Sequence, residues 1–269
     1  MIEINKIYNE NCLETMAKMP DCFIDLTVTS PPYDNLREYK GYSFDFESIA
    51  KELYRVTKVG GVVVWVVGDA TIKGSETGTS FKQALFFKEC GFNLHDTMIW
   101  FKSVVMPTNS NRYDPSFEYM FVMSKGKTNV FNPIKKTNIN AGKYKREAIK
   151  QDRSSLSENS NSKSISGKEI KYKEEGTLPY VWICATGLHG STSDKIAFQH
   201  PAIFPEKLVY DHILSWSNPD DLVYDCFMGS GTTAKVSIIT KRNYIGSEIS
   251  DEYCEIIRKR LMKEQNTLL

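Results

Sequence analysis

The sequence lacks the features that mark membrane, secreted and metal-binding proteins. No apolar run approaches the roughly 20 residues of a membrane-spanning helix, and residues 1–6 do not begin a signal peptide. Its six cysteines are scattered, and no two of them form a C-x-x-C pair. We therefore expect reduced thiols, a cytoplasmic location, no metal and no membrane partner.

The composition is that of an ordinary globular protein with one unusual segment. The chain has 269 residues, of which 41% are hydrophobic and 25% charged, which fits one large domain or one domain with an insertion. Residues 131–177 lose all periodicity and carry eleven Lys/Arg against six Asp/Glu, although the whole chain has a net charge of only +1. This segment is predicted to be a partly flexible insertion, either a solvated loop or a surface for a polyanion.

Strand and helix patterns alternate along the rest of the chain, which predicts an α/β fold with helices on both faces of a mostly parallel sheet. A turn ending at Gly60-Gly61 is expected to precede the continuous apolar strand 62–67, which is typical of a sheet centre. Further strands are predicted at 24–28, 97–101, 118–123, 222–225 and 244–248, and helices at 44–56, 80–90, 205–216, 232–240 and 251–261.

The pentapeptide Thr29-Ser30-Pro31-Pro32-Tyr33 follows the first buried strand. Two consecutive prolines cannot continue a helix or a sheet ladder, so the chain leaves the strand extended and stiff. Ser30 offers a hydroxyl, Pro31 a carbonyl and Tyr33 a flat ring, which together suit an amino group on a stackable ring such as a nucleobase. The alternative is that the motif is only a proline-rich strand exit with a tyrosine in the core.

A second motif, Asp225 to Thr233 (DCFMGSGTT), lies between a predicted strand and a predicted helix. Its glycines permit a tight turn and a close approach of a ligand to the backbone, but no G-K-[ST] follows, which excludes a P-loop. Glu248 ends the next strand, 19 residues after Gly229, where a Rossmann-type site accepts hydrogen bonds from ribose hydroxyls. The pair indicates a nucleoside ligand without a pyrophosphate.

A strand with an SPPY exit and a strand–DxFxGSGTT–helix unit together resemble the amino-type DNA methyltransferases, which methylate cytosine N4 or adenine N6. Because the SPPY motif precedes the glycine motif, the order resembles the circularly permuted β class, with a target-recognition region between the two. The resemblance implies a Rossmann-like methyltransferase domain of residues 1–130 and 178–269, with residues 131–177 as the inserted recognition region. It further implies S-adenosylmethionine as the cofactor, S-adenosylhomocysteine as the product, and no metal.

Other stretches support the same resemblance. Asn11-Cys12 stands in the family's GDCL segment, where an acid contacts the cofactor adenine, and an asparagine oxygen can also accept from an amino group. The segment from His200 resembles the family's sequence around the methionine end of the cofactor, although His200 also reads as an ordinary helix-entry residue. The implied catalytic residues are Ser30, Pro31, Pro32 and Tyr33, and the implied cofactor-binding residues are Asn11, Cys12, His200, Pro201, Phe204, Asp225, Phe227, Gly229, Ser230, Gly231, Thr232, Thr233 and Glu248.

The expected reaction is direct methyl transfer to a base flipped out of duplex DNA. Serine at position 30 is the family's usual choice for cytosine N4, whereas Asp or Asn is usual for adenine N6, so N4 is favoured and N6 stays open. Carbon-5 methylation is disfavoured because no Pro-Cys dipeptide occurs. A protein or RNA amine methyltransferase and a non-catalytic nucleic-acid-binding module are more distant alternatives. A monomer or weak homodimer is expected, with a restriction endonuclease as a functional partner or none for an orphan or phage enzyme.

Overall fold

The computed structural model describes residues 2–32, 44–105, 107, 111–138, 145–147, 169–171, 173–187 and 190–267. The chain forms two compact units. The larger unit consists of Met1–Asn132 and Tyr180–Leu269, and the smaller one of Pro133–Pro179.

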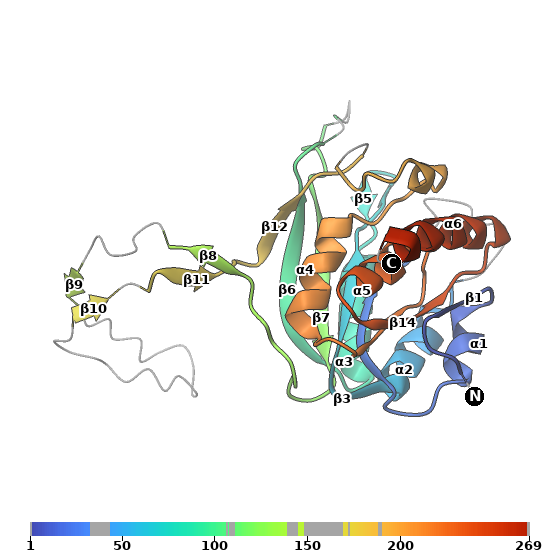
Figure 1. Cartoon of the computed structure of the whole chain (residues 1–269). Coiled ribbons are helices and arrows are strands. Elements are labelled where there is room, and N and C mark those ends of the chain that lie inside the picture. Colours follow the sequence, from blue (N-terminus) through green and yellow to red (C-terminus); the bar gives the residue numbers. More distant parts are fainter. Residues whose placement is uncertain are drawn as a thin grey trace. The chain divides into compact units, whose positions relative to one another are not determined.

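The larger unit is built on an eight-stranded sheet in the order β1–β14–β13–β2–β3–β7–β6–β12 (Figure 1). Neighbouring strands run parallel except where β7 pairs antiparallel with β3 and β6. The strands are β1 (Lys6–Tyr8), β2 (Ile24–Thr29), β3 (Thr57–Val67), β6 (Asn93–Lys102), β7 (Phe117–Ser124), β12 (Val181–Cys184), β13 (Leu222–Asp225) and β14 (Asn243–Ser247). The chain moves from β2 to β3 on one side and later to β13 and β14 on the other, so the topological switch point lies between β2 and β13.

Helices cover both faces of this sheet (Figure 1). One group packs on one face and the other on the opposite face, which confirms the predicted α/β fold with a mostly parallel sheet. The first group is α1 (Cys12–Ala17), α2 (Phe46–Val56) and α3 (Thr79–Glu89), and the second is α4 (Glu206–Trp216), α5 (Thr232–Ile239) and α6 (Asp251–Thr267), with a short 3-10 helix η1 (Lys195–Gln199) before α4.

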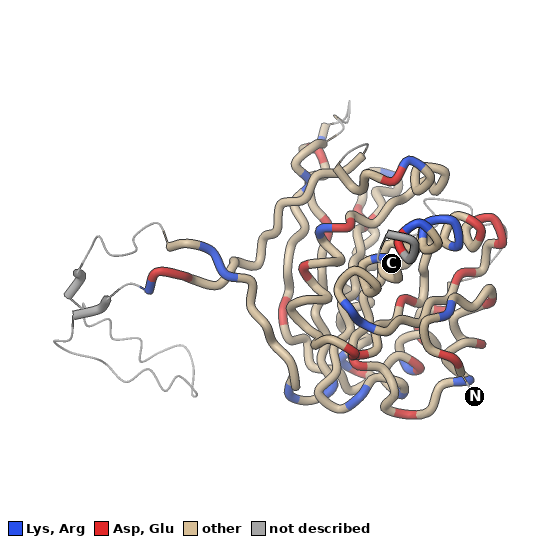
Figure 2. The backbone as a smooth tube through the Cα atoms, in the orientation of Figure 1, with Lys and Arg blue, Asp and Glu red and all other residues tan. Residues whose placement is uncertain are grey.

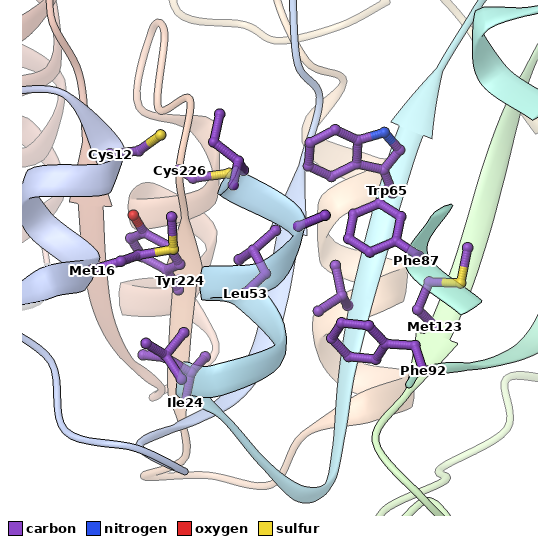
Figure 3. Close-up of a cluster of buried hydrophobic side chains, with 14 of the residues drawn as sticks. Cys12, Met16, Ile24, Leu53, Trp65, Phe87, Phe92, Met123, Tyr224 and Cys226 are labelled. Carbon is purple, nitrogen blue, oxygen red and sulfur yellow. The ribbon is translucent and has the colours of Figure 1, made fainter. Parts of the chain in front are cut away.

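The central strand β3 fixes the core. Its residues Val63, Trp65 and Val67 point to a cluster that includes Leu53 of α2 and Phe87 of α3 (Figure 3). The alternate valines of β3 are equally buried, so both faces of the strand are covered. This confirms that the β-branched run is a central strand.

The ends of several elements differ from the sequence prediction. Gly60 and Gly61 do not end a turn but lie inside β3, where the register against β2 shifts. Gly60 adopts a φ of 83° while its N–H donates to the Lys125 carbonyl. A bulge with a left-handed glycine therefore continues the strand, because β7 supplies partners that the local sequence does not reveal.

Two helix boundaries also differ from the predicted ones. Helix α2 begins at Phe46 rather than at residue 44, because Asp45 caps it through Oδ1, which accepts from the Ser48 N–H at 3.2 Å. The last helix continues beyond residue 261 to Thr267.

A short hairpin, β4 (Thr71–Ile72) with β5 (Ser75–Glu76), follows β3. Across the described residues, no helix combines the length and apolarity needed to cross a bilayer.

The smaller unit contains two antiparallel strand pairs, β8 (Lys135–Thr137) with β11 (Glu175–Thr177) and β9 (Lys145–Glu147) with β10 (Glu169–Lys171). Figure 2 shows basic residues on β8 and acidic residues at the start of β11. The serine-rich stretch 154–166 lies outside the described residues, so its flexibility stays a prediction.

Candidate functional site

The two sequence motifs meet at adjoining strand ends. Strands β2 and β13 are parallel neighbours, with Tyr224 opposite Thr27. At their carboxyl ends, Thr29 Oγ1 donates to Asp225 Oδ1 at 2.6 Å, and both side chains are buried. The SPPY exit and the glycine loop therefore start side by side at the switch point, where open α/β sheets bind their ligands.

Asp225 organises the start of the glycine loop. Besides Thr29, its carboxylate accepts from Thr233 Oγ1 at 2.7 Å and from the Phe227 N–H at 3.0 Å. Burial raises the pKa of the Asp225 carboxyl, against the lowering effect of these hydrogen bonds. Because its contacts lie within the protein, Asp225 can shape the loop and place α5 without touching a ligand.

The proline exit continues from β2 at this edge. Ser30 and Pro32 are half-buried and Pro31 is buried, so the exit is held against the domain. Tyr33 lies outside the described residues, and its predicted stacking role stays a prediction.

The loop between β13 and α5 depends on two glycines with left-handed backbone. Gly229 has a φ of 54° and Gly231 a φ of 85°. A Cβ on Gly231 would lie 3.0 Å from the Ile257 side chain, and a Cβ on Gly229 would lie 3.3 Å from the His200 ring. A side chain at either position would be strained and crowded, so the loop requires glycine at both. Ser230, Thr232 and Thr233 are buried behind the loop.

Glu248 lies directly beyond the end of β14, beside the same loop. Its Oε2 accepts from the Gly229 N–H at 2.8 Å, and its Oε1 accepts from the Ser250 N–H at 2.9 Å. Burial raises the pKa of the Glu248 carboxyl, while these backbone donors partly oppose the shift. The predicted ribose acid is thus in contact with the predicted cofactor loop, and its role towards a ribose stays a prediction.

The first predicted segment, Asn11-Cys12, begins α1. Asn11 caps the helix, since its Oδ1 accepts from the Leu13 N–H at 2.9 Å. Cys12 is 5% exposed and belongs to the hydrophobic cluster, together with Cys226 (Figure 3). Burial raises the pKa of the Cys12 thiol to about 12, so this side chain is an inert core group rather than a polar contact.

Asn9 joins this segment to Glu248, and it is not among the residues that the sequence predicts. Its Nδ2 donates to the Glu248 carbonyl at 3.2 Å, and the Glu248 N–H donates to the Tyr8 carbonyl at 3.0 Å. The pairing of β1 with β14 is the signal that would have found it, and that pairing is not visible in local sequence.

The His200 segment approaches the loop from the other side. His200 is buried, its Nδ1 accepts from the Ala202 N–H at 3.1 Å, and its ring packs edge-on against Tyr253 at 4.3 Å between centroids. Pro201 is exposed and Phe204 half-buried. Phe227 packs at its ring edge on Trp65, 6.2 Å between centroids, and so links the loop to the core.

The predicted residues that the structure describes therefore lie close together, and they suit a nucleoside-type cofactor. A glycine cradle without Cβ atoms, a carboxylate at the next strand end and a half-buried hydroxyl occupy one edge of the sheet. Among the described residues, no three His, Cys, Asp or Glu side chains gather closely enough to hold a metal ion.

Comparison with known proteins identifies the family. A model of the family described as DNA methylase matches residues 24–259. The chain belongs to this family of DNA methylases. It is also 57% identical over 243 residues to the orphan methyltransferase M.BamHII of Bacillus amyloliquefaciens, covering 90% of this chain and 89% of that protein. The resemblance predicted from the two motifs is thereby confirmed.

Two solved structures share the fold of this DNA methylase. The PvuII DNA methyltransferase, described as cytosine-N4-specific, matches with a TM-score of 0.68 at 22% identity, over 97% of this chain and 90% of that one. The complex of M1.HpyAVI with S-adenosylmethionine matches with a TM-score of 0.59 at 23% identity, over 95% and 98% of the two chains.

Proposed function

We propose that this DNA methylase transfers the methyl group of S-adenosylmethionine to the exocyclic N4 of cytosine in duplex DNA. The hydrogen bond between Thr29 and Asp225 carries the proposal, because it joins the start of the SPPY exit to the start of the glycine loop at 2.6 Å. Direct transfer needs an amine-holding group and a cofactor loop side by side, and most of its rate comes from such positioning.

The cofactor supplies an electrophilic methyl group on a sulfonium centre. The glycine loop at Gly229–Gly231 receives it, and Glu248 accepts hydrogen bonds from its ribose hydroxyls. Asn11 accepts from the adenine amino group through the second lone pair of Oδ1, the first being used by Leu13. His200, Pro201 and Phe204 border the methionine end.

Asp225, Cys12, Phe227, Thr232 and Thr233 contribute to cofactor binding in a different way. Their side chains are wholly or partly buried within the protein, so they shape the pocket wall instead of contacting the cofactor. Ser230 is likewise buried, so its side chain does not contact the cofactor either.

An exocyclic amine is a weak nucleophile because its lone pair is delocalised into the ring. Ser30 Oγ and the Pro31 carbonyl accept its two hydrogens, which draws the nitrogen towards a tetrahedral geometry and directs its lone pair at the methyl group. These acceptors lie where positive charge develops, so no base is needed before attack and the proton leaves afterwards. Pro32 keeps the exit stiff, and Tyr33 stacks on the flipped base.

The choice of cytosine rests on Ser30. A neutral hydroxyl stands where adenine-specific members usually carry Asp or Asn, and the similar PvuII enzyme is described as cytosine-N4-specific. Adenine N6 is the second candidate, since both amines present two hydrogens to the same acceptors.

The smaller unit, Pro133–Pro179, is assigned to target recognition. Its sequence carries eleven Lys/Arg against six Asp/Glu, although the whole chain has a net charge of only +1, which suits contacts with phosphates, while polar side chains read base edges.

The product base decides the proposal. Duplex DNA methylated with labelled cofactor is digested to nucleosides and analysed by mass spectrometry. Labelled N4-methylcytosine is the expected product. Label found only in N6-methyladenine would reject cytosine in favour of the second candidate.

A Ser30→Ala variant tests the catalytic assignment. It should bind S-adenosylhomocysteine as the wild type does, because Ser30 holds the base and not the cofactor, while its transfer rate falls by about 10²-fold or more. An unchanged transfer rate would remove Ser30 from the chemistry.

A further inference from the structure

One face of helix α6 contacts the glycine loop and His200, which both border the proposed cofactor site. Tyr253, Ile257, Arg260 and Glu264 recur at a spacing of four, three and four residues, which places them in one stripe along the helix. Tyr253 packs on His200, Ile257 lies against Gly231, and Glu264 pairs with Lys235 at 3.3 Å. Figure 1 shows α6 alongside α5, which the glycine loop precedes.

Arg260 is the polar centre of this stripe. Its side chain is fully buried, although the sequence places it in a basic stretch that resembles a solvated helix end. Nη1 donates to the Ser230 carbonyl at 2.6 Å and lies 3.2 Å from Ser230 Oγ and 3.3 Å from Thr232 Oγ1. One guanidinium nitrogen therefore holds the middle residue of the glycine loop from behind.

The other two guanidinium nitrogens bind carboxylates on either side of the His200–Phe204 segment. Nη2 donates to Glu206 Oε1 at 2.9 Å, and Nε donates to Asp194 Oδ2 at 3.3 Å. Asp194 precedes η1 and Glu206 begins α4, so these two carboxylates stand on either side of the His200–Phe204 segment. The planar fork of arginine thus joins the glycine loop to the two residues that flank the His200–Phe204 segment.

Lys235 neutralises the same two carboxylates. Its buried Nζ donates to Asp194 Oδ2 at 2.6 Å and to Glu206 Oε1 at 2.9 Å. Burial alone would raise the pKa of the Asp194 carboxyl, but Lys235 and Arg260 hold it below its usual value. Within the described chain, however, the Lys235 ammonium makes no hydrogen bond to Ser230 or Thr232, so the two cations share partners but differ at the loop.

We propose that Arg260 is a positioning residue, which sets the glycine loop and the His200–Phe204 segment at the separation that the cofactor requires. This rests on the proposed function, because it assigns both segments to S-adenosylmethionine. If the guanidinium served only to balance the buried charge of Asp194 and Glu206, its role would be the same as that of Lys235. Loss of its contact with the Ser230 carbonyl would then have no effect on cofactor binding.

Binding of S-adenosylhomocysteine, measured by calorimetry without DNA, tests the proposal beside the unfolding midpoint of each variant without ligand. Arg260→Met should bind at least about tenfold more weakly, the loss expected for one charge-assisted hydrogen bond. Lys235→Met should lower the unfolding midpoint comparably but weaken binding less than about threefold. Arg258→Met, an exposed change on the same helix, controls for altered net charge.

Arg260→Lys separates charge from geometry. One ammonium cannot reach the Ser230 carbonyl and both carboxylates, so its affinity should fall between those of wild type and Arg260→Met. In steady-state methylation, Arg260→Met should raise the KM for the cofactor more than it lowers kcat. If Arg260→Met does not fold, an Arg260→Lys protein with weakened binding supports the proposal, and one with wild-type binding rejects it.

The outcomes separate the two proposals. Wild-type protein that fails to bind S-adenosylhomocysteine would overturn the proposed cofactor and this inference with it. Wild-type protein that binds, with Arg260→Met binding within about threefold of it or weakened no more than Lys235→Met, would overturn the role of Arg260 alone.

Discussion

Thr29 Oγ1 donates to Asp225 Oδ1 across 2.6 Å, although 196 residues separate them in the chain. The same carboxylate also receives hydrogen bonds from Thr233 and from the Phe227 backbone. A single buried group therefore fixes the end of β2, the glycine loop and the first turn of α5 relative to one another. The permuted order of the motifs does not matter to the site, because the sheet brings both strand ends together.

A Thr29→Val substitution should show how much the hydrogen bond between Thr29 and Asp225 contributes to stability and to methyl transfer. Valine keeps the shape but removes the donor, and leaves the buried carboxylate short of one partner. We expect the free energy of unfolding to fall by about 1–3 kcal/mol, and methyl transfer to fall as well. Urea unfolding followed by circular dichroism measures the first effect.

Thr27→Val is the matched control, two residues earlier on the same strand. Thr27 is fully buried, and its Oγ1 finds no hydrogen-bond partner in the described chain. Loss of an unpaired buried hydroxyl should leave stability unchanged or increase it. Equal destabilisation by the two valines would show that the Thr29 hydroxyl has no special role.

Glu248 provides a second test, through cofactor affinity. Its two oxygens accept from Gly229 and Ser250. Glu248→Gln replaces one acceptor by an NH₂ group and removes the charge, so the dissociation constant for S-adenosylhomocysteine should rise by roughly tenfold or more. Glu255→Gln, an exposed change on α6, should leave binding as it is. Wild-type affinity in Glu248→Gln would contradict the ribose assignment.

Features set by the local chain could be predicted from sequence, and features set by distant partners could not. The Pro-Pro exit after Thr29 and the glycine loop before Thr232 depend on backbone chemistry that neighbouring residues decide. The bulge at Gly60 depends on β7, and the burial of Arg260 depends on Asp194 and Glu206, which lie more than fifty residues away in sequence. A charged residue on a basic helix gives no local sign that three segments will enclose it.

The pH dependence of the site follows from the raised pKa of Glu248. An ionised carboxylate accepts from ribose hydroxyls, so affinity for S-adenosylhomocysteine should fall as the pH is lowered towards and through that raised pKa, above the ordinary value of 4.5. Stability moves the other way. Because the folded pKa exceeds the unfolded one, the contribution of Glu248 to the free energy of unfolding is fully present below the unfolded value and is lost as the pH rises through the folded value.

Calorimetry and urea unfolding in a pH series that begins below 4.5 would measure both effects, with Glu248→Gln as the non-titrating reference that retains Asp225. The variant should show a flatter pH dependence of affinity. Identical pH profiles for the two proteins would exclude Glu248 as the titrating group.

DNA binding should depend steeply on salt if the smaller unit meets phosphates. Lys135 and Lys136 are exposed on β8. If each contacts a phosphate, Lys135→Gln with Lys136→Gln should reduce the slope of log affinity against log salt by about two, with similar loss on any duplex sequence. Fluorescence anisotropy of a labelled duplex over a salt series measures the slope.

The matched control is Lys88→Gln with Lys241→Gln. Both lysines are exposed, and they precede the amino ends of β6 and β14, at the sheet edge opposite the strand ends that form the site. This pair removes the same charge, so a general loss of electrostatic attraction would lower the slope equally in both double variants. A drop confined to Lys135 and Lys136 assigns the phosphate contacts to β8, whereas equal drops would assign them to the overall charge of the chain.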